Sequence, residues 1–175
     1  MIFEKAIQDD IDAVGILYCT VCDYLSAHIN YPGWYKHIYP TKADAQSSLD
    51  EGTLYVCKEN DKNTIVGSVV LKHAPGNRYS GEHWLTPDDY EKIYVIHTLA
   101  VHPNYNHLGI GKYMMDAIEG MAKSEHCISI RLDVVKGNIP AEKLYQKCGY
   151  HYITTKNLGY EDIGLPWFNL YEKTL

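Results

Sequence analysis

The sequence lacks several features of membrane-bound, secreted and nucleic-acid-binding proteins. No run approaches the roughly 20 apolar residues of a bilayer-spanning helix, and the mean hydropathy is −0.30. The first ten residues lack the basic and then apolar order of a signal peptide. Lysine and arginine number 16 against 22 aspartates and glutamates, and this net charge of −6 disfavours a phosphate backbone as the main partner. We therefore expect a cytoplasmic protein that binds neither membranes nor nucleic acid.

Cysteine is scarce and odd in number, at five residues, whereas a secreted disulfide framework normally pairs its thiols. Cys19 and Cys22 form a lone CxxC inside an apolar helical pattern. Zinc needs four ligands, and no second CxxC or histidine pair accompanies this one. We expect buried structural thiols and no metal, with a redox or metal role as the alternative.

The length and composition predict one globular domain. The chain has 175 residues, of which 46% are hydrophobic and 22% charged, and this length is enough to bury a core without disulfides or metal. The sequence contains no repeat, low-complexity tract or linker. We therefore expect a single domain over residues 1–175.

Two hydrophobic periodicities alternate along the chain. Alternating or continuous apolar runs predict strands at 2–7, 53–58, 65–72, 93–101, 128–135, 150–155 and 167–173. Apolar residues at three- and four-residue spacing predict helices that begin at Asp9 and Thr41, the second ending at Gly52, and further helices at 110–125 and 139–148. The strands at 53–58 and 65–72 form a hairpin through the polar turn 59–63. The strand–helix–strand segment from 93 to 135 is a βαβ unit with parallel strands, so the sheet is mixed.

The segment Asn-His-Leu-Gly-Ile-Gly-Lys at 106–112 lies between a central strand and its helix. Glycines let backbone amides approach a bulky anion, and a helix start adds unpaired N–H groups that suit a phosphate. No Gly-Lys-Ser/Thr of a Walker loop follows, and Met114 replaces the third glycine of a dinucleotide fingerprint. A plain strand-to-helix turn is the alternative.

A second pair of polar residues lies on the last predicted helix. Asn138 precedes the helix and Tyr145 follows seven residues later, so both share one face about two turns apart. Taken singly, Asn138 is more typical of a helix cap and Tyr145 of a half-buried core aromatic.

In chain order, Leu-Ala-Val-His-Pro at 99–103, Gly-Ile-Gly-Lys at 109–112 and Gly-Asn-Ile-Pro-Ala-Glu-Lys-Leu-Tyr-Gln-Lys-Cys-Gly-Tyr at 137–150 form a spaced set. This set resembles the GNAT superfamily of acyl-CoA-dependent N-acetyltransferases, with the close match at 93–152. The resemblance implies an α/β fold with a mixed, mostly antiparallel sheet of about seven strands, about four helices and one parallel βαβ crossover. It also implies acetyl transfer from acetyl-CoA to a primary amine, without metal.

The resemblance also implies roles for individual residues. The backbone of Leu99, Ala100 and Val101 would pair with the pantetheine arm, and Asn138 would hydrogen-bond that arm. Tyr145 would protonate the departing thiolate. The following amides would hold the pyrophosphate: His107, Leu108, Gly109, Ile110, Gly111 and Lys112. The family usually has Arg or Gln, and then often Gly, where this chain has Asn106 and His107. This departure from the family pattern is expected to weaken or reshape phosphate binding.

The residue that takes the proton of the amine has two sets of candidates. His97 is the only ionisable side chain inside the apolar central strand, on a face shared by period two with Val95, Leu99 and Val101. A core or wall histidine is the alternative reading of His97. The other candidates are the carboxylates of a loop, which could also attract a cationic amine or simply be solvated: Glu82, Asp88, Asp89 and Glu91.

The acceptor is expected at the aromatic stretch 31–39 and the polar excursion 73–90, with packing of those aromatics in the core as the alternative. The acceptor would be a small molecule or a peptide, and the protein a monomer or homodimer. The alternative functions are a catalytically weak acyl-CoA-binding regulatory module, suggested by Asn106 and His107, and a nucleotide-binding domain suggested by the glycines alone.

Overall fold

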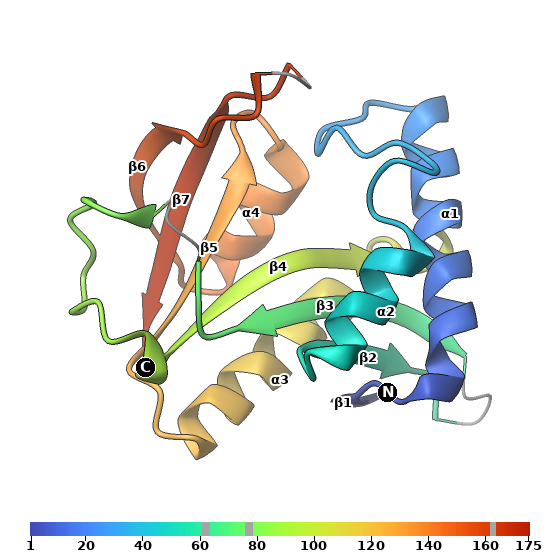
Figure 1. Ribbon diagram of the computed structural model, residues 1–175, viewed down its shortest axis with the longest axis horizontal. Coiled ribbons are helices and arrows are strands. Elements are labelled where there is room, and N and C mark those ends of the chain that lie inside the picture. The colour runs from blue at the N-terminus through green and yellow to red at the C-terminus, as the bar shows by residue number, and fades with distance from the viewer. Residues whose placement is uncertain (61–63, 76–78, 162–163) are drawn as a thin grey trace. The chain divides into compact units, whose positions relative to one another are not determined.

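The computed structural model describes residues 1–60, 64–75, 79–161 and 164–175, so part of the predicted turn 59–63 lies outside the described residues. The described ranges contain seven strands and four α-helices (Figure 1). In chain order they are β1 (Ile2–Lys5), α1 (Ile11–Ala27), α2 (Lys42–Asp50), β2 (Leu54–Lys58), β3 (Ile65–Lys72), β4 (Ile93–Val101), α3 (Ile110–Ser124), β5 (Ser129–Val135), α4 (Ile139–Lys147), β6 (His151–Asn157) and β7 (Trp167–Thr174). None of the helices in these ranges has both the length and the apolar character of a membrane span.

The strands form one sheet in the order β1-β2-β3-β4-β5-β7-β6. The pairs β1–β2, β2–β3, β5–β7 and β6–β7 are antiparallel. β4 and β5 are parallel, in a register that runs from Ile93 opposite Ser129 to Ile96 opposite Leu132. The predicted mixed sheet, the hairpin of β2 and β3 and the βαβ crossover through α3 are therefore confirmed.

The chain forms two compact units, and it passes from one to the other around residues 30–34, at the end of β3, within β4 and within α3. The first unit contains residues 1–30, 34–71 and 98–114, and the second contains 31–33, 72–97 and 115–175. Each unit has an apolar core of its own.

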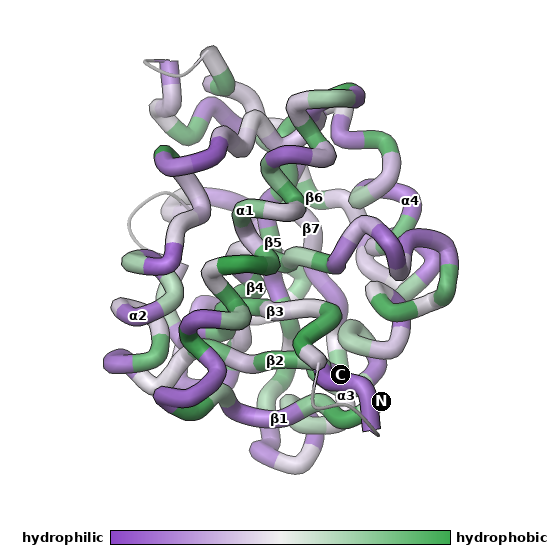
Figure 2. Tube along the Cα trace, turned by 90° about the vertical axis from the view of Figure 1, so that its right-hand side faces the viewer, coloured by the Kyte–Doolittle hydropathy of each residue, from purple (hydrophilic) through white to green (hydrophobic). Residues whose placement is uncertain are grey.

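The core of the first unit lies between one face of α1, the helix α2 and the strands β2 and β3. Figure 2 shows hydrophobic and hydrophilic segments alternating along α1, as expected for a helix with one buried face. The fully or almost fully buried members of α1 include Ile11, Val14, Leu17, Tyr18 and Cys22. Thr41 begins α2, as predicted, since its Oγ1 accepts from the Asp44 N–H at 3.3 Å, and Gly52 ends the turn that follows with a φ of +69°.

The predicted start of the first helix at Asp9 is wrong by one residue. A short 3-10 turn at Gln8–Asp10 precedes α1, and the Asp10 carboxylate accepts from the Ile7 N–H at 3.0 Å. The other oxygen of Asp10 pairs with the buried Lys58 ammonium at 2.8 Å. Asp10 is therefore the residue whose carboxylate serves both the helix start and a buried cation, while Asp9 stays exposed.

The core of the second unit lies around β4, β5 and β7. It includes Ile93 and Val95 of β4 and Phe168 and Leu170 of β7. α4 packs on this sheet through Tyr145, whose ring lies 6.3 Å from that of Tyr171 on β7.

β4 is covered on both faces along its first half, since residues 93–96 are all buried. This confirms the expectation from its continuous apolar run. Thr98 then has a φ of +47°, a conformation that a β-branched residue rarely adopts. The regular alternation predicted from His97 to Leu99 and Val101 is interrupted there.

Candidate active site

The loop before α3 has the backbone of an anion site. The first helical hydrogen bond runs from the Tyr113 N–H to the Gly109 carbonyl at 2.9 Å, so the amides of Ile110, Gly111 and Lys112 precede the intrahelical ladder. Gly109 has a φ of +81°, and a Cβ placed on it would meet nothing within 4 Å. A phosphate fits this open helix start, because N–H groups and the positive end of the helix dipole both favour an anion.

The two residues that depart from the family pattern retain a compatible backbone. His107 has a φ of +64°, in the left-handed region that favours glycine. The Asn106 N–H donates to Pro103 at 3.1 Å, and the Leu108 N–H donates to Tyr105 at 3.3 Å. The Leu108 amide is therefore already used inside the loop, unlike the expectation that it faces the phosphate.

The second half of β4 provides the three residues expected to pair with the pantetheine arm. The described β4–β5 ladder ends at Ile96, so Leu99, Ala100 and Val101 lie beyond it. Ala100 belongs to the core of the first unit, whereas Leu99 and Val101 are partly exposed. The Thr98 hydroxyl, at the interruption of the strand, lies 2.5 Å from the Tyr39 hydroxyl.

The part of the aromatic stretch that belongs to the first unit, residues 34–39, divides between core and surface. Trp34 packs against the core, which favours the structural reading for that residue. Tyr35 and Tyr39 are 55% and 42% exposed, so their rings are available to a ligand.

In the second unit, Asn138 lies at the start of α4. Its Oδ1 accepts from the Ala141 N–H at 3.4 Å, so it has the capping role that we gave as its alternative. The capping bond uses the side-chain oxygen, and the two N–H donors of the amide are not part of it.

Tyr145 lies two turns further along α4 and is buried, at 6% exposed. Burial raises the pKa of its phenol most, and the negative charge of Asp133 and the neighbouring Cys148 raise it further. The phenol therefore stays protonated at neutral pH and can act as a proton donor.

His97 is half-buried in β4, and its Nε2 is buried without a hydrogen-bond partner among the described residues. Burial lowers the pKa of the imidazole, and the charge of Lys72 lowers it further. The Asp133 carboxylate and a hydrogen bond with the Ala74 backbone oppose this change. The net pKa is lowered, so the imidazole is neutral at neutral pH and can accept a proton.

The acidic loop residues considered as alternative bases are mostly engaged elsewhere in the second unit. Glu82 pairs with Lys156 at 2.7 Å and Asp89 with Lys92 at 3.1 Å. Asp88 pairs with Arg131 at 2.5 Å. These ion pairs favour a structural role for three of the four carboxylates; Glu91 is exposed.

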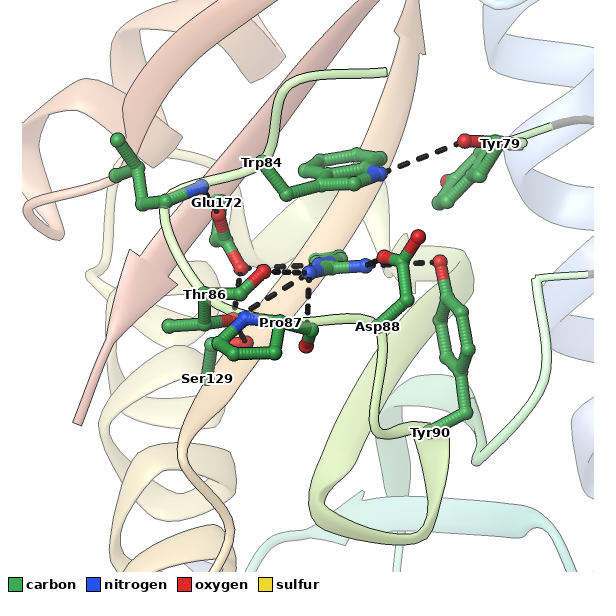
Figure 3. Close-up of polar contacts among 10 residues, drawn as sticks. Tyr79, Trp84, Thr86, Pro87, Asp88, Tyr90, Ser129 and Glu172 are labelled. Carbon is green, nitrogen blue, oxygen red and sulfur yellow. Dashed lines mark hydrogen bonds and ion pairs between the residues drawn. The ribbon is translucent and has the colours of Figure 1, made fainter. Parts of the chain in front are cut away.

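Arg131 of β5 organises a cluster that the sequence analysis did not identify (Figure 3). Its guanidinium is fully buried and donates to Glu172 at 2.9 Å, to the Tyr90 hydroxyl at 2.9 Å and to the Thr86 carbonyl at 2.8 Å. The indole ring of Trp84 lies 4.3 Å from the guanidinium carbon. The excursion 73–90 is therefore fastened to β5 and β7 over its described second half.

A second missed contact joins the same excursion to β5. The hydroxyl of the buried Tyr79 donates to Asp133 Oδ1 at 2.5 Å. The signal for this pair and for the arginine cluster was the spacing of Arg131 and Asp133, two charges at period two in an otherwise apolar strand.

The five cysteines are free thiols, four of them buried and Cys19 partly exposed. The Cys22 thiol lies 4.0 Å from the Tyr39 carbonyl. Burial raises the pKa of Cys22, so this thiol is less reactive than an exposed one. Within the part of the chain that the structure describes, no group of three or more His, Cys, Asp or Glu side chains could hold a metal ion.

The fold is similar to that of solved acetyltransferase structures. An acetyltransferase of the GNAT family from Streptococcus agalactiae 2603 is 16% identical, with a TM-score of 0.81 over 99% of this chain and 95% of that one. A GNAT-family acetyltransferase from Listeria monocytogenes 4b F2365 is 16% identical, with a TM-score of 0.75 over 99% and 94%. The protein yncA from Salmonella typhimurium, solved with its cofactor acetyl-CoA, is 14% identical, with a TM-score of 0.67 over 99% and 93%.

No curated protein matches the sequence. A family profile does match, over residues 21–150, and its description is acetyltransferase (GNAT) family. This match contains the glycine loop before α3, the half-buried His97 and the buried Tyr145. Since it covers more than half of the sequence and agrees with the fold, the chain belongs to the acetyltransferase (GNAT) family.

Proposed function

We propose that the protein transfers an acetyl group from acetyl-CoA to a primary amine, with residues 1–175 acting as one acetyltransferase domain. The observation that carries this proposal is the open start of α3, where a Cβ on Gly109 would meet nothing within 4 Å and the amides of Ile110 and Gly111 precede the first helical hydrogen bond. Acetyl-CoA, when bound, supplies an acetyl group activated as a thioester. Support for this cosubstrate comes from the family match and from the acetyl-CoA in the yncA structure.

In the first unit, the amides of His107 and of residues 109–112 hold the pyrophosphate. Their N–H groups are on the glycine loop or precede the helical ladder of α3, and the dipole of the 15-residue helix adds a favourable potential. The backbone of residues 99–101, beyond the β4–β5 ladder, hydrogen-bonds the pantetheine arm. A backbone N–H in this segment polarises the thioester carbonyl.

In the second unit, Asn138 and Tyr145 act on the same cosubstrate. Asn138 donates from its amide nitrogen to the arm while its oxygen caps α4. Tyr145 gives its phenolic proton to the leaving thiolate. A thiol of this type has a pKa near ~8.5, so its departure needs only modest help from a proton donor.

His97 takes the proton of the acceptor. A lysine-type amine has a pKa of ~10.4 and is almost fully protonated at neutral pH, so it must lose a proton before it can attack. The neutral imidazole has a buried Nε2 without a partner, and this nitrogen is the group that accepts the proton.

The acceptor is an amine on a small molecule or a peptide. The exposed Tyr35 and Tyr39 of the first unit supply aromatic faces, which attract a cationic ammonium group. In the second unit, the exposed Glu91, just after the excursion 73–90, adds a carboxylate. This negative charge favours cationic acceptors.

Calorimetric titration followed by a turnover assay tests the proposal. We expect the protein to bind acetyl-CoA in preference to NAD or ATP, and to release free thiol when a panel of primary amines is added. Binding without thiol release on any amine would favour a regulatory acyl-CoA-binding module. Preference for NAD or ATP would favour a nucleotide-binding domain instead.

A further inference from the structure

Asp133 of β5 and His97 of β4 each follow the last pair of the parallel β4–β5 ladder, and the charge of Asp133 acts on the His97 imidazole. The parallel register pairs Ile96 of β4 with Leu132 of β5. The residue that follows Ile96 is His97, and the residue that follows Leu132 is Asp133. Successive side chains alternate between the faces of a sheet, so neighbours in register project on the same side. The Asp133 carboxylate is also the strongest of the groups that raise the pKa of His97.

Asp133 is itself held by an aromatic hydroxyl from the excursion. Tyr79, which is 2% exposed, donates to Asp133 Oδ1 at 2.5 Å. Burial and the Asp133 charge raise the pKa of Tyr79 well above its usual value, so the phenol remains a donor at all physiological pH values.

The arginine cluster fixes Tyr79 in turn. In Figure 3 the indole nitrogen of Trp84 points toward the Tyr79 backbone, and this N–H donates to the Tyr79 carbonyl at 3.4 Å. The Trp84 ring covers the Arg131 guanidinium, and the two rings of Tyr79 and Trp84 lie 5.3 Å apart. A chain of contacts therefore runs from the fully buried Arg131 to the carboxylate beside His97.

We propose that Asp133, oriented by Tyr79, is a positioning residue for His97 and stabilises the imidazolium that forms when His97 removes the proton of the acceptor amine. This inference rests on the proposed function. It adds to that function the Asp133 carboxylate, the Tyr79 phenol and the arginine cluster that holds Tyr79. None of these groups touches the substrate in the proposed arrangement.

The N–H bond of the acceptor ammonium breaks, its electron pair stays on the amine nitrogen, and the proton forms an N–H bond at His97 Nε2. The imidazolium then faces the Asp133 carboxylate, which offsets its charge in a poorly solvated position. The proton later passes to water, which returns His97 to its neutral form.

The charged and titratable groups around His97 come from three elements. Lys72, at the end of β3, lowers the pKa of His97, and Asp133 on β5 raises it. The backbone of Ala74, in the segment after β3, raises it through a hydrogen bond. The Asp133 carboxylate is thus the negative charge that opposes burial and Lys72. The same carboxylate raises the pKa of Tyr145, which keeps the proposed proton donor protonated.

The first measurement is the titration of His97 by NMR in the free protein, with its resonance assigned from His97→Gln. Asp133→Asn removes the charge and keeps the shape, and we expect the pKa of His97 to fall by about one unit. Asp133→Glu retains the charge and should restore most of this loss. Asp116→Asn makes the same chemical change at an exposed position of α3 and should not move the titration.

The second measurement is the pH dependence of kcat/KM for the full-length protein. In Asp133→Asn the acidic limb should move to lower pH by the same amount as the NMR titration, and kcat should fall roughly three- to tenfold. Tyr79→Phe keeps the charge, so its His97 titration should stay nearer to wild type while kcat still falls. If Asp133→Asn does not fold, Asp133→Ser removes the same charge and should give the same fall in pKa.

An unchanged titration of His97 in the folded Asn or Ser variant would overturn the inference, whatever the enzymatic activity. A lowered titration in a protein that acetylates no amine would instead uphold the pairing of Asp133 with His97 and contradict the proposed function. If the pKa of His97 falls but the acidic limb of the kcat/KM profile does not move, the role of this pair in proton removal would be overturned.

Discussion

The rings of Tyr145 and Tyr150 lie 6.0 Å apart at the end of α4, and the two residues are 6% and 5% exposed. Burial is the main cause that raises the pKa of both phenols. The Tyr150 hydroxyl is buried without a partner among the described residues, whereas Tyr145 is the proposed proton donor. Replacing either tyrosine with phenylalanine removes one buried hydroxyl from nearly the same surroundings, so Tyr150→Phe is a matched control for Tyr145→Phe.

Tyr145→Phe should lower kcat by about tenfold, because a thiol with a pKa near ~8.5 leaves with only modest help from a proton donor. The affinity for CoA should change little, since the phenol is proposed to act on the leaving group. Tyr150→Phe should leave both quantities near wild type. Steady-state kinetics with calorimetric CoA binding makes the comparison, and equal kcat values for the two variants would remove Tyr145 from the donor role.

Gly109→Ala should weaken CoA binding by about tenfold, which corresponds to about 1.4 kcal/mol. The new methyl group would project into the open space at the start of α3, and a φ of +81° strains any residue with a Cβ. Gly120→Ala on the exposed side of α3 also meets nothing within 4 Å, and should stabilise the helix by about 0.5–1 kcal/mol without affecting CoA. Tight CoA binding by Gly109→Ala would place the pyrophosphate elsewhere.

Arg131→Met should lower the free energy of unfolding by about 3–5 kcal/mol, because it leaves the fully buried Glu172 carboxylate without its cation. Lys36→Met removes the cation of an ion pair with Asp23 whose side chains are 41% and 58% exposed, and should have little effect. Urea unfolding of both variants measures the difference. A similar loss in the two variants would mean that the arginine cluster contributes no more than a surface ion pair.

The lowered pKa of His97 predicts a specific acid sensitivity. Below the usual pKa of ~6.5 the unfolded chain binds a proton at this position that the folded protein resists, so stability is lost as the pH falls through this range. The decrease in unfolding free energy from about pH 7.5 to about pH 5.5 should be smaller in His97→Gln than in wild type. His151→Gln, at an exposed position, controls for the substitution itself. Identical pH profiles for wild type and His97→Gln would contradict a buried, neutral imidazole.

The sequence predicted what local patterns determine. Continuous apolar residues identified β4, two apolar runs joined by a polar turn identified the hairpin of β2 and β3, and Thr41 marked the start of α2. Asp9 and Asp10 are both reasonable caps by residue type, and the choice between them depends on the buried Lys58, which lies 48 residues from Asp10. The φ of +47° at Thr98 follows from tertiary structure, since no local signal favours it.

The candidate site was predictable only where its residues form a spaced motif. The glycine loop and Tyr145 belong to such a motif. The ion-pair partners of Arg131 are Asp88 and Glu172, which are far apart in the sequence. Alternation along a strand puts Arg131 and Asp133 on one face of β5, but it does not identify which groups meet them there, and neither residue was predicted to belong to the site.

The most direct measurement uses acetyl-CoA labelled in its acetyl group, the full-length protein and a panel of primary amines, with free thiol and labelled amide quantified together. We expect equal amounts of both products with at least one amine, formed more slowly by Tyr145→Phe. Thiol release without labelled amide, or bound coenzyme with neither product on any amine, would contradict acetyl transfer as the function of this protein.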